Sequence, residues 1–317
     1  MIYRGIHNYS HIWLSAIILL LAVTPAHGMR LINVELLFEI SDQLNQPSDV
    51  AVSKDGRIYV VDGVNNRIRI YNPQGTPISA LGTPGDGEGE FKYPLGIDID
   101  DAGRIYVADS GNHRVQIFDR KGAFISQINL PGTKAHPADP TDLVVDDTRN
   151  RCYVVDNDNH RILVYDLAGL KLINEYGKPG TGKREFRYPF LIALDKNNYL
   201  YIVDVINTRV QELNPEGAFV NFIGGWGVEK GEFFRPKGVA LDQQGRIYVS
   251  DSYMGVIQIF ESTGDFFAAL GESATNRVKK FKTPVGIFID HQNRLYIVEM
   301  YANKVSVYRL VGETESN

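Results

Sequence analysis

The stretch DSGNHRVQIF, residues 109–118, places four chemically versatile residue types close together. Asp109, Asn112, His113 and Arg114 lie within six positions. A histidine beside a carboxylate could act as a general base or as a metal ligand. The same residues could instead be structural, because Asp and Asn side chains bond to nearby backbone groups in turns. The elements around the cluster must decide between these interpretations.

The cluster belongs to a repeat that fills most of the chain. Its copies are VDGVNNRIRIY (61–71), ADSGNHRVQIF (108–118), VDNDNHRILVY (155–165), VDVINTRVQEL (203–213), SDSYMGVIQIF (250–260) and VEMYANKVSVY (298–308). Each copy follows a segment led by a proline: Pro47, Pro94, Pro140, Pro189, Pro236 and Pro284. These prolines are 47, 46, 49, 47 and 48 residues apart, which indicates six units of a repeat protein.

Each unit has the pattern of four short strands. In the second unit, residues 96–100, 104–109, 114–119 and 123–130 are rich in β-branched and aromatic residues. The breaks DDAG and DRKG contain the Asp and Gly that tight turns need. No apolar positions recur at helical spacing. The pattern predicts an all-β fold, a six-bladed β-propeller with four antiparallel strands per blade.

The two ends of the chain complement each other. The sixth unit stops after three strands, at residues 308–310, while the segment ELLFEI (35–40) precedes the first unit. We expect this N-terminal strand to close the last blade, because the ring then has no open sheet edge.

The repeat resembles the NHL repeat, named for Asn-His-Leu. The pattern P-x-G-I-x-x-D-x-x-G-R-I-Y-V-x-D-x-x-N-H-R-V-x-I-F carries the resemblance, and the tripeptide is Asn112-His113-Arg114 or Asn159-His160-Arg161 here. The resemblance covers all six units, about residues 35–310. It implies a six-bladed propeller that usually serves as a binding platform, although a few relatives carry a catalytic metal at the central channel.

Residues 1–28 have the character of a secretory signal peptide. Arg4 precedes an apolar run at residues 12–24, and small residues follow at Ala26 and Gly28. We expect cleavage near Gly28, export to the periplasm or the extracellular space, and a single propeller over residues 29–317. A retained membrane anchor is the alternative, but it needs about 20 apolar residues. The one cysteine, Cys152, has no intrachain partner, and we interpret it as a buried apolar residue.

An acid at the end of the second strand and a base five positions later predict an ion pair across the turn. The expected pairs are Asp62–Arg67, Asp109–Arg114, Asp156–Arg161, Asp204–Arg209 and Glu299–Lys304. The fifth unit departs from the pattern, since Val256 stands where the base is expected. A propeller has one channel and does not need five active sites, so we interpret these pairs as structural.

His113 and His160 share one turn position. The other units place there Asn66, Thr208, Gly255 and Asn303. That variety favours a hydrogen-bonding turn residue. As an alternative, His113, His136 and His160 could hold a divalent metal, but zinc ligands must converge to about 2.0–2.2 Å from one ion. Equivalent positions on neighbouring blades are usually too far apart, so we predict no metal and no other cofactor.

Departures from the repeat gather in units four to six. Tyr253 and Tyr301 share one turn position, and Trp226 lies in the loop that enters the fifth unit. The loops 177–189 and 271–283 each carry four basic residues against one glutamate. Aromatic residues, Met and Arg are enriched at interface centres. The predicted binding residues are Trp226, Tyr253, Met254, Met300, Tyr301, Arg187, Arg235 and Lys280.

Together these features predict an exported binding or scaffolding module rather than an enzyme. The expected partner is an acidic protein or an anionic glycan of the cell envelope, bound by the loop face of blades four to six. The net charge of -5 and the expected export argue against nucleic acid. A membrane is expected to contact the chain only through an uncleaved N-terminal segment.

A metal-dependent lyase or lactonase acting at the channel mouth is the alternative function. Such an enzyme needs clustered His, Asp and Glu near the starts of the innermost strands. There, only Asp49 and Asp142 are acidic, and they come from non-adjacent units.

Overall fold

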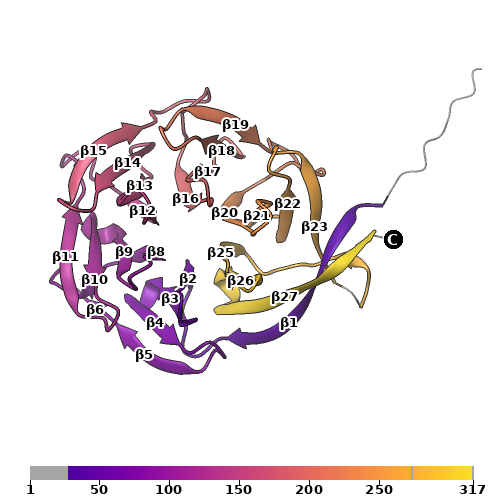
Figure 1. Cartoon of the computed structure of the whole chain (residues 1–317), viewed down its shortest axis with the longest axis horizontal. Coiled ribbons are helices and arrows are strands. Elements are labelled where there is room, and N and C mark those ends of the chain that lie inside the picture. Colours follow the sequence, from indigo (N-terminus) through magenta and orange to yellow (C-terminus); the bar gives the residue numbers. More distant parts are fainter. Residues whose placement is uncertain (1–27, 273, 316–317) are drawn as a thin grey trace, which may run out of the picture.

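The computed structural model describes residues 28–272 and 274–315, and all but the last residue of the predicted signal peptide lies outside the described residues. Six blades form a ring around a central axis (Figure 1). The innermost strands of all six blades line one cavity of about 250 Å³ on this axis. The predicted six-bladed β-propeller is thus confirmed.

Blades one to four are four-stranded antiparallel sheets in chain order. Blade one contains β2 (Val50–Val52), β3 (Ile58–Asp62), β4 (Arg67–Tyr71) and β5 (Pro77–Leu81). Blade two contains β8 (Pro94–Ile99), β9 (Ile105–Asp109), β10 (Arg114–Phe118) and β11 (Phe124–Asn129). Blade three contains β12 (Pro140–Asp146), β13 (Arg151–Asp156), β14 (Arg161–Asp166) and β15 (Lys171–Tyr176). Blade four contains β16 (Pro189–Leu194), β17 (Leu200–Asp204), β18 (Arg209–Leu213) and β19 (Phe219–Ile223). The strands expected in the second unit agree with blade two to within two residues.

Blades five and six belong to one larger sheet. Blade five contains β20 (Pro236–Leu241), β21 (Ile247–Asp251), β22 (Val256–Phe260) and β23 (Phe266–Glu272), with the short β24 (Arg277–Val278) beside β23. Blade six contains β25 (Pro284–Ile289), β26 (Arg294–Glu299) and β27 (Lys304–Glu315). The short strands β6 (Thr83–Pro84) and β7 (Glu90–Phe91) pair in the loop that enters blade two.

The N-terminal strand β1 (Arg30–Ile40) closes the ring as expected. It pairs antiparallel with β27 as the outermost strand of blade six. The structure adds a contact that the repeat did not predict: Leu31–Val34 of β1 also pair in parallel with Ala269–Glu272 of β23 in blade five. One strand therefore ties two blades together, and Figure 1 shows β1 crossing from one to the other.

The core lies between the blades. Strands such as β9, β17 and β21, the second in their blades, are buried along their whole length. Their side chains form six apolar clusters, one between each pair of adjacent blades around the closed ring. Cys152 is a fully buried member of the cluster between blades two and three, and burial raises the pKa of its thiol. The prediction of an apolar role is confirmed.

No helix in the described part of the chain is both long enough and apolar enough to span a bilayer.

Candidate functional site

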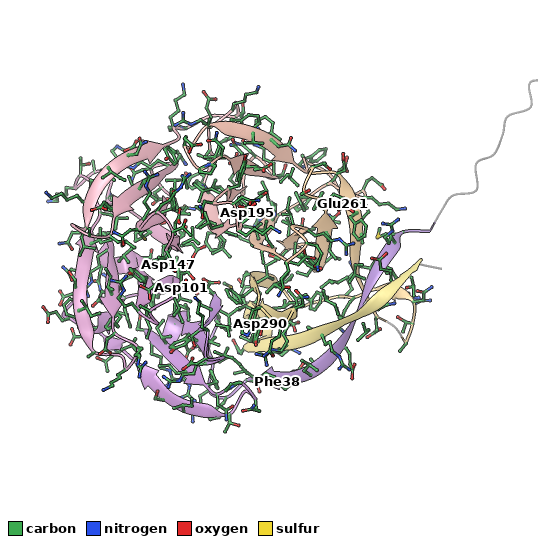
Figure 2. The ribbon with its side chains drawn as sticks, viewed as in Figure 1. Phe38, Asp101, Asp147, Asp195, Glu261 and Asp290 are labelled. Atoms are coloured by element: carbon green, nitrogen blue, oxygen red, sulfur yellow. The ribbon has the colours of Figure 1, made fainter. Side chains whose placement is uncertain are left out.

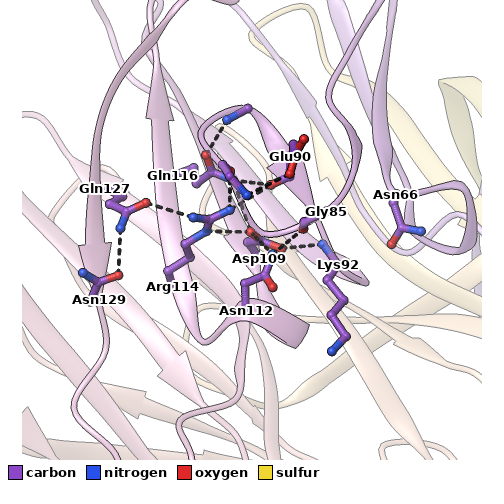
Figure 3. Close-up of polar contacts among 12 residues, drawn as sticks. Asn66, Gly85, Glu90, Lys92, Asp109, Asn112, Arg114, Gln116, Gln127 and Asn129 are labelled. Atoms are coloured by element: carbon purple, nitrogen blue, oxygen red, sulfur yellow. Dashed lines mark hydrogen bonds and ion pairs between the residues drawn. The ribbon is translucent and has the colours of Figure 1, made fainter.

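The five predicted ion pairs are all formed. The acid–base distances in the first four blades are 2.7, 2.8, 2.8 and 2.9 Å, and Lys304 lies 3.4 Å from Glu299 in blade six. Asp109 is fully buried and also accepts the backbone N–H of Lys92 and the side-chain amides of Asn112 and Gln116 (Figure 3). The cluster of Asp109, Asn112 and Arg114 therefore has a structural role, which is to stabilise the turn between β9 and β10.

The side chains of this turn also bind the loop that enters the same blade. In blade two, Arg114 donates to the carbonyl oxygens of Gly87 (2.7 Å) and Glu90 (2.9 Å), while Asn112 donates to that of Gly85 (2.9 Å). Blade four repeats this with Arg209 and Asn207, which donate to the carbonyl oxygens of Gly180, Gly182 and Glu185. The repeated turn thus fixes the position of a loop on the face where binding is predicted.

A glutamate gives the entry loops a common shape. Glu90 and Glu185 each accept a backbone N–H from the glycine three residues earlier, and Glu232 accepts that of Glu229, at 2.9–3.0 Å. The side chains at the tips of these loops differ in chemistry. The tips carry Asp86 and Glu88 on blade two, Lys183 and Arg184 on blade four, and Trp226, Val228 and Lys230 on blade five. A constant frame with variable tips is suited to recognition.

Blade five lacks both loop tethers. Met254 occupies the position of Asn112, and Val256 pairs with Asp251 in the register that Arg114 and Asp109 share. The loop keeps the Glu232 bond and the two bonds of Gln258, which donates to the carbonyl oxygen of Glu232 and accepts the N–H of Gly231. It also keeps backbone bonds, such as that from the N–H of Gly227 to the carbonyl oxygen of Phe233. Its tip is the most exposed apolar feature of the described surface, with Trp226 76% and Val228 62% exposed.

The predicted binding residues divide into two groups. Met254 and Lys280 lie together, because the Lys280 ammonium donates to the carbonyl oxygen of Met254 at 3.0 Å and both line one cavity over blade five. Tyr253 is 69% exposed and packs on Phe234, with ring centroids 4.2 Å apart.

The other predicted binding residues lie on the same face of the fold without such contacts. Trp226 and Tyr301 are exposed, and within residues 28–272 and 274–315 no ring contact joins them to Tyr253. Arg187 and Arg235 use their backbone N–H groups to bond Asp204 and Asp251, which leaves their guanidinium groups out of those bonds. Met300 begins the short turn that presents Tyr301. Five of the eight predicted residues therefore share a face rather than a single contact patch.

The histidines have structural partners. His113 and His160 adopt left-handed backbone conformations and reach the entry segment of the next blade. The Nδ1 atom of His113 lies 2.5 Å from the carbonyl oxygen of Ala138, and that of His160 accepts the N–H of Tyr188 at 3.1 Å. His136 is exposed. In the described ranges, no group of three or more His, Cys, Asp or Glu residues has the geometry to hold a metal ion.

The channel contains one carboxylate that the sequence pattern missed, beside two that it named. Asp49 and Asp142 both line the axial cavity although their blades are not adjacent, and Asp98 of blade two lines it with them. Each accepts a backbone N–H from the next blade: Asp49 from Ile97, Asp98 from Val145 and Asp142 from Ile192, at 2.8–3.1 Å. Farther along, turn residues such as Asp101, Asp147, Asp195 and Asp290 surround the axis (Figure 2).

Burial raises the pKa of Asp49 and of Asp98 to about 7. For Asp142, burial and the neighbouring Asp49 raise the pKa well above its usual range. These carboxyl groups bond to the backbone, and the raised pKa of each favours its neutral, protonated form. Such a donor set suits inter-blade fastening better than a divalent cation.

We predict that these acids make stability pH-dependent. Unfolded aspartates have a pKa of about 3.9, so between about pH 4 and 7 the folded state holds protons that the unfolded state has released. Stability should therefore fall as pH rises through this window. Asp98→Asn keeps an acceptor for Val145 and cannot ionise. Relative to wild type, it should gain about 2–4 kcal/mol at pH 8 and little at pH 4.5 in urea unfolding. Asp101→Asn, in an exposed turn, is the control, and an equal response in both variants would contradict the prediction.

A half-buried lysine near the start of the innermost strand of blade five also escaped the sequence analysis. The Lys237 ammonium lies 3.9 Å from the ring centroid of Phe190, and burial, with Arg235 nearby, lowers its pKa to about 8. The available signal was its place directly after Pro236, where the other units have uncharged residues.

Family models agree with this architecture. A model described as a 6-bladed beta-propeller (DUF5128) matches residues 101–214, and a model of the NHL repeat matches residues 44–71 and 233–260. The protein is an NHL-repeat-containing six-bladed β-propeller. No curated protein matches its sequence.

Solved structures share the fold at low sequence identity. A virginiamycin B lyase from Staphylococcus aureus is 16% identical over 89% of this chain and 87% of its own, with a TM-score of 0.63. A gluconolactonase from Xanthomonas campestris is 15% identical over 88% and 89%, with a TM-score of 0.65. A protein of unknown function from Bacteroides thetaiotaomicron is 17% identical over 89% and 72%, with a TM-score of 0.64. At these identities the likeness concerns the fold alone.

Proposed function

We propose that the protein is an exported binding module that recognises an acidic partner, a protein or an anionic glycan of the cell envelope, through the loop face of blades four to six. The observation that carries the proposal is the departure of blade five from the repeated turn. There the turn that fastens loops elsewhere has lost its Asn and Arg, and the loop above it exposes Trp226 and Val228. Exposed aromatic residues without a structural contact are typical of interaction surfaces.

Charge supports the choice of an acidic partner. Ion pairs engage Lys178 with Glu185 and Lys279 with Glu272 in the two basic loops. In the described part of the chain, no ion pair engages the side chains of Arg187, Arg235 or Lys280. These cations flank the exposed aromatics and are available to steer an anionic partner.

The triple variant Trp226→Ala, Tyr253→Ala, Tyr301→Ala tests the proposal. These side chains are largely exposed, so the variant should fold and melt close to wild type. We expect it to lose at least about tenfold in capture of envelope components by the immobilised protein, because each lost aromatic anchor costs about 1 kcal/mol or more. The control replaces Tyr93, an exposed tyrosine on the blade-two entry segment, with Ala. Equal capture by the triple variant and the wild type would refute the proposal.

An enzyme acting at the channel is the second candidate. The likeness of the chain's fold to a lyase and to a gluconolactonase favours it, together with the axial cavity that the innermost strands line. Metal analysis of the purified protein, combined with a lactone hydrolysis assay, would separate the two candidates.

A further inference from the structure

A second binding feature lies beside the proposed partner surface. A cavity of about 350 Å³ sits over blade five, between the entry loop and strands β22, β23 and β24. Its apolar lining comes from Met29, Val228, Met254, Val256, Ala269 and Val278. The volume falls within the range of about 300–1,000 Å³ that is usual for small-molecule sites.

The cavity exists in this form because the repeat is broken at two positions of blade five. The hollow at the equivalent place over blade two is lined by Arg114 together with Asp86, Glu88 and Gln127, so it is polar. In blade five, Val256 removes the guanidinium and Met254 removes the asparagine amide. Each of these two departures removes a side chain that would donate hydrogen bonds to the entry loop. Together they make this wall of the cavity apolar.

The rim of the cavity is positively charged. Lys230 and Lys280 line it against a single acid, Glu229. The one uncharged polar side chain in the lining, that of Gln258, has both its amide nitrogen and its amide oxygen engaged by the entry loop. The interior thus offers apolar surface, and its one uncharged polar side chain is already hydrogen-bonded. The entrance offers two ammonium groups.

We propose that this cavity binds a small amphipathic anion, an organic molecule with an apolar body and a carboxylate, of the chemistry of a fatty acid. The apolar body would lie between Val228, Val256 and Val278, and the carboxylate would pair with Lys230 and Lys280. A sugar does not fit this chemistry, because its hydroxyl groups would lose hydrogen bonds in the apolar interior. A bilayer surface does not fit the concave shape. The inference goes beyond the proposed partner surface, although Met254 and Lys280 belong to both.

The test uses purified full-length protein and three probes. We expect 8-anilinonaphthalene-1-sulfonate to bind with saturable fluorescence at one site, and dodecanoate to displace it. Dodecan-1-ol has the same chain without the charge and should displace the dye at least about tenfold more weakly. If dodecan-1-ol displaced the dye as strongly as dodecanoate does, that result would overturn the role of the lysines.

Val256→Arg is the decisive variant. It restores the residue found in the first four blades, so Asp251 gains the partner that Asp109 has and the fold is not expected to suffer. The new guanidinium would enter the cavity, and affinity for dodecanoate should fall at least about tenfold. Tyr93→Ala, at an exposed position outside the cavity lining, should bind like wild type. Unchanged dodecanoate binding by a folded Val256→Arg protein would refute the site.

Two other occupants would show themselves in the same experiment. Dodecanoate binding that occurs only after removal of residues 1–28 would make the N-terminal segment the occupant, since that segment precedes Met29 in the lining. Flotation with phosphatidylglycerol vesicles without dodecanoate binding would make the surface a membrane contact. Either result overturns the proposal. Partner capture is measured separately, so failure of the fatty-acid site leaves the proposed function standing, and the reverse also holds.

Discussion

Removing the closing strand, residues 29–42, is expected to destroy the cooperative fold. Strand β1 buries Leu31, Ile32, Val34 and Ile40, and complete burial of such side chains contributes about 1.5–3 kcal/mol each. Their sum, about 6–12 kcal/mol, is comparable with the whole stability of a typical domain. The deletion would also expose edges of β27 and β23 at once. We expect the melting temperature to fall by more than about 10 °C, or the transition to vanish.

A pair of substitutions on the same strand controls for the severity of the deletion. Leu31→Asp places a charge at a fully buried position that faces blade five, whereas Leu36→Asp does so at an exposed position of the same strand. The first should cost at least about 3 kcal/mol in urea unfolding. The second should stay within about 1 kcal/mol of wild type. Equal stability of both variants, together with an unchanged melting curve for the deletion, would refute closure by β1.

The repeat predicted the blades because its signals are local. Strand boundaries follow from β-branched runs and turn residues within a unit, and the Asp–Arg pair spans five positions of one hairpin. Cys152 could be interpreted from its equivalents in the other units, all of them Ile or Leu. Comparison between units therefore substitutes for an alignment in a repeat protein.

The missed residues depend on how the units meet. Asp98 lies two positions deeper in its strand than Asp49 and Asp142 do in theirs, so comparison of equivalent positions did not connect the three. They converge because the ring brings innermost strands together across the axis. The parallel pairing of β1 with β23 likewise depends on the path of the strand beyond its own blade. The cavity over blade five requires side chains from an entry loop and several strands.

The second large effect is expected from restoring the repeat in blade five. Replacing residues 252–256, SYMGV, by SGNGR supplies the Asn and Arg that hold the blade-two entry loop. Gly255 is kept, because a Cβ atom there would lie 2.7 Å from the carbonyl oxygen of Phe281. The loop carbonyl oxygens of blade five would gain donors, each worth about 0.5–1.5 kcal/mol. We expect stability to rise by about 1–2 kcal/mol in urea unfolding. The same graft removes Tyr253 and Met254 from the surface.

Partner capture by this graft is the most direct test of the central claim, which is that function lies where the repeat is broken. The control carries SGNGR in place of residues 63–67, GVNNR, in blade one, where the Asn and Arg are already present. We expect the blade-five graft to be more stable than wild type and to capture at least about tenfold less of the envelope partner, while the blade-one graft captures as wild type does. A stable blade-five graft with undiminished capture would contradict the claim.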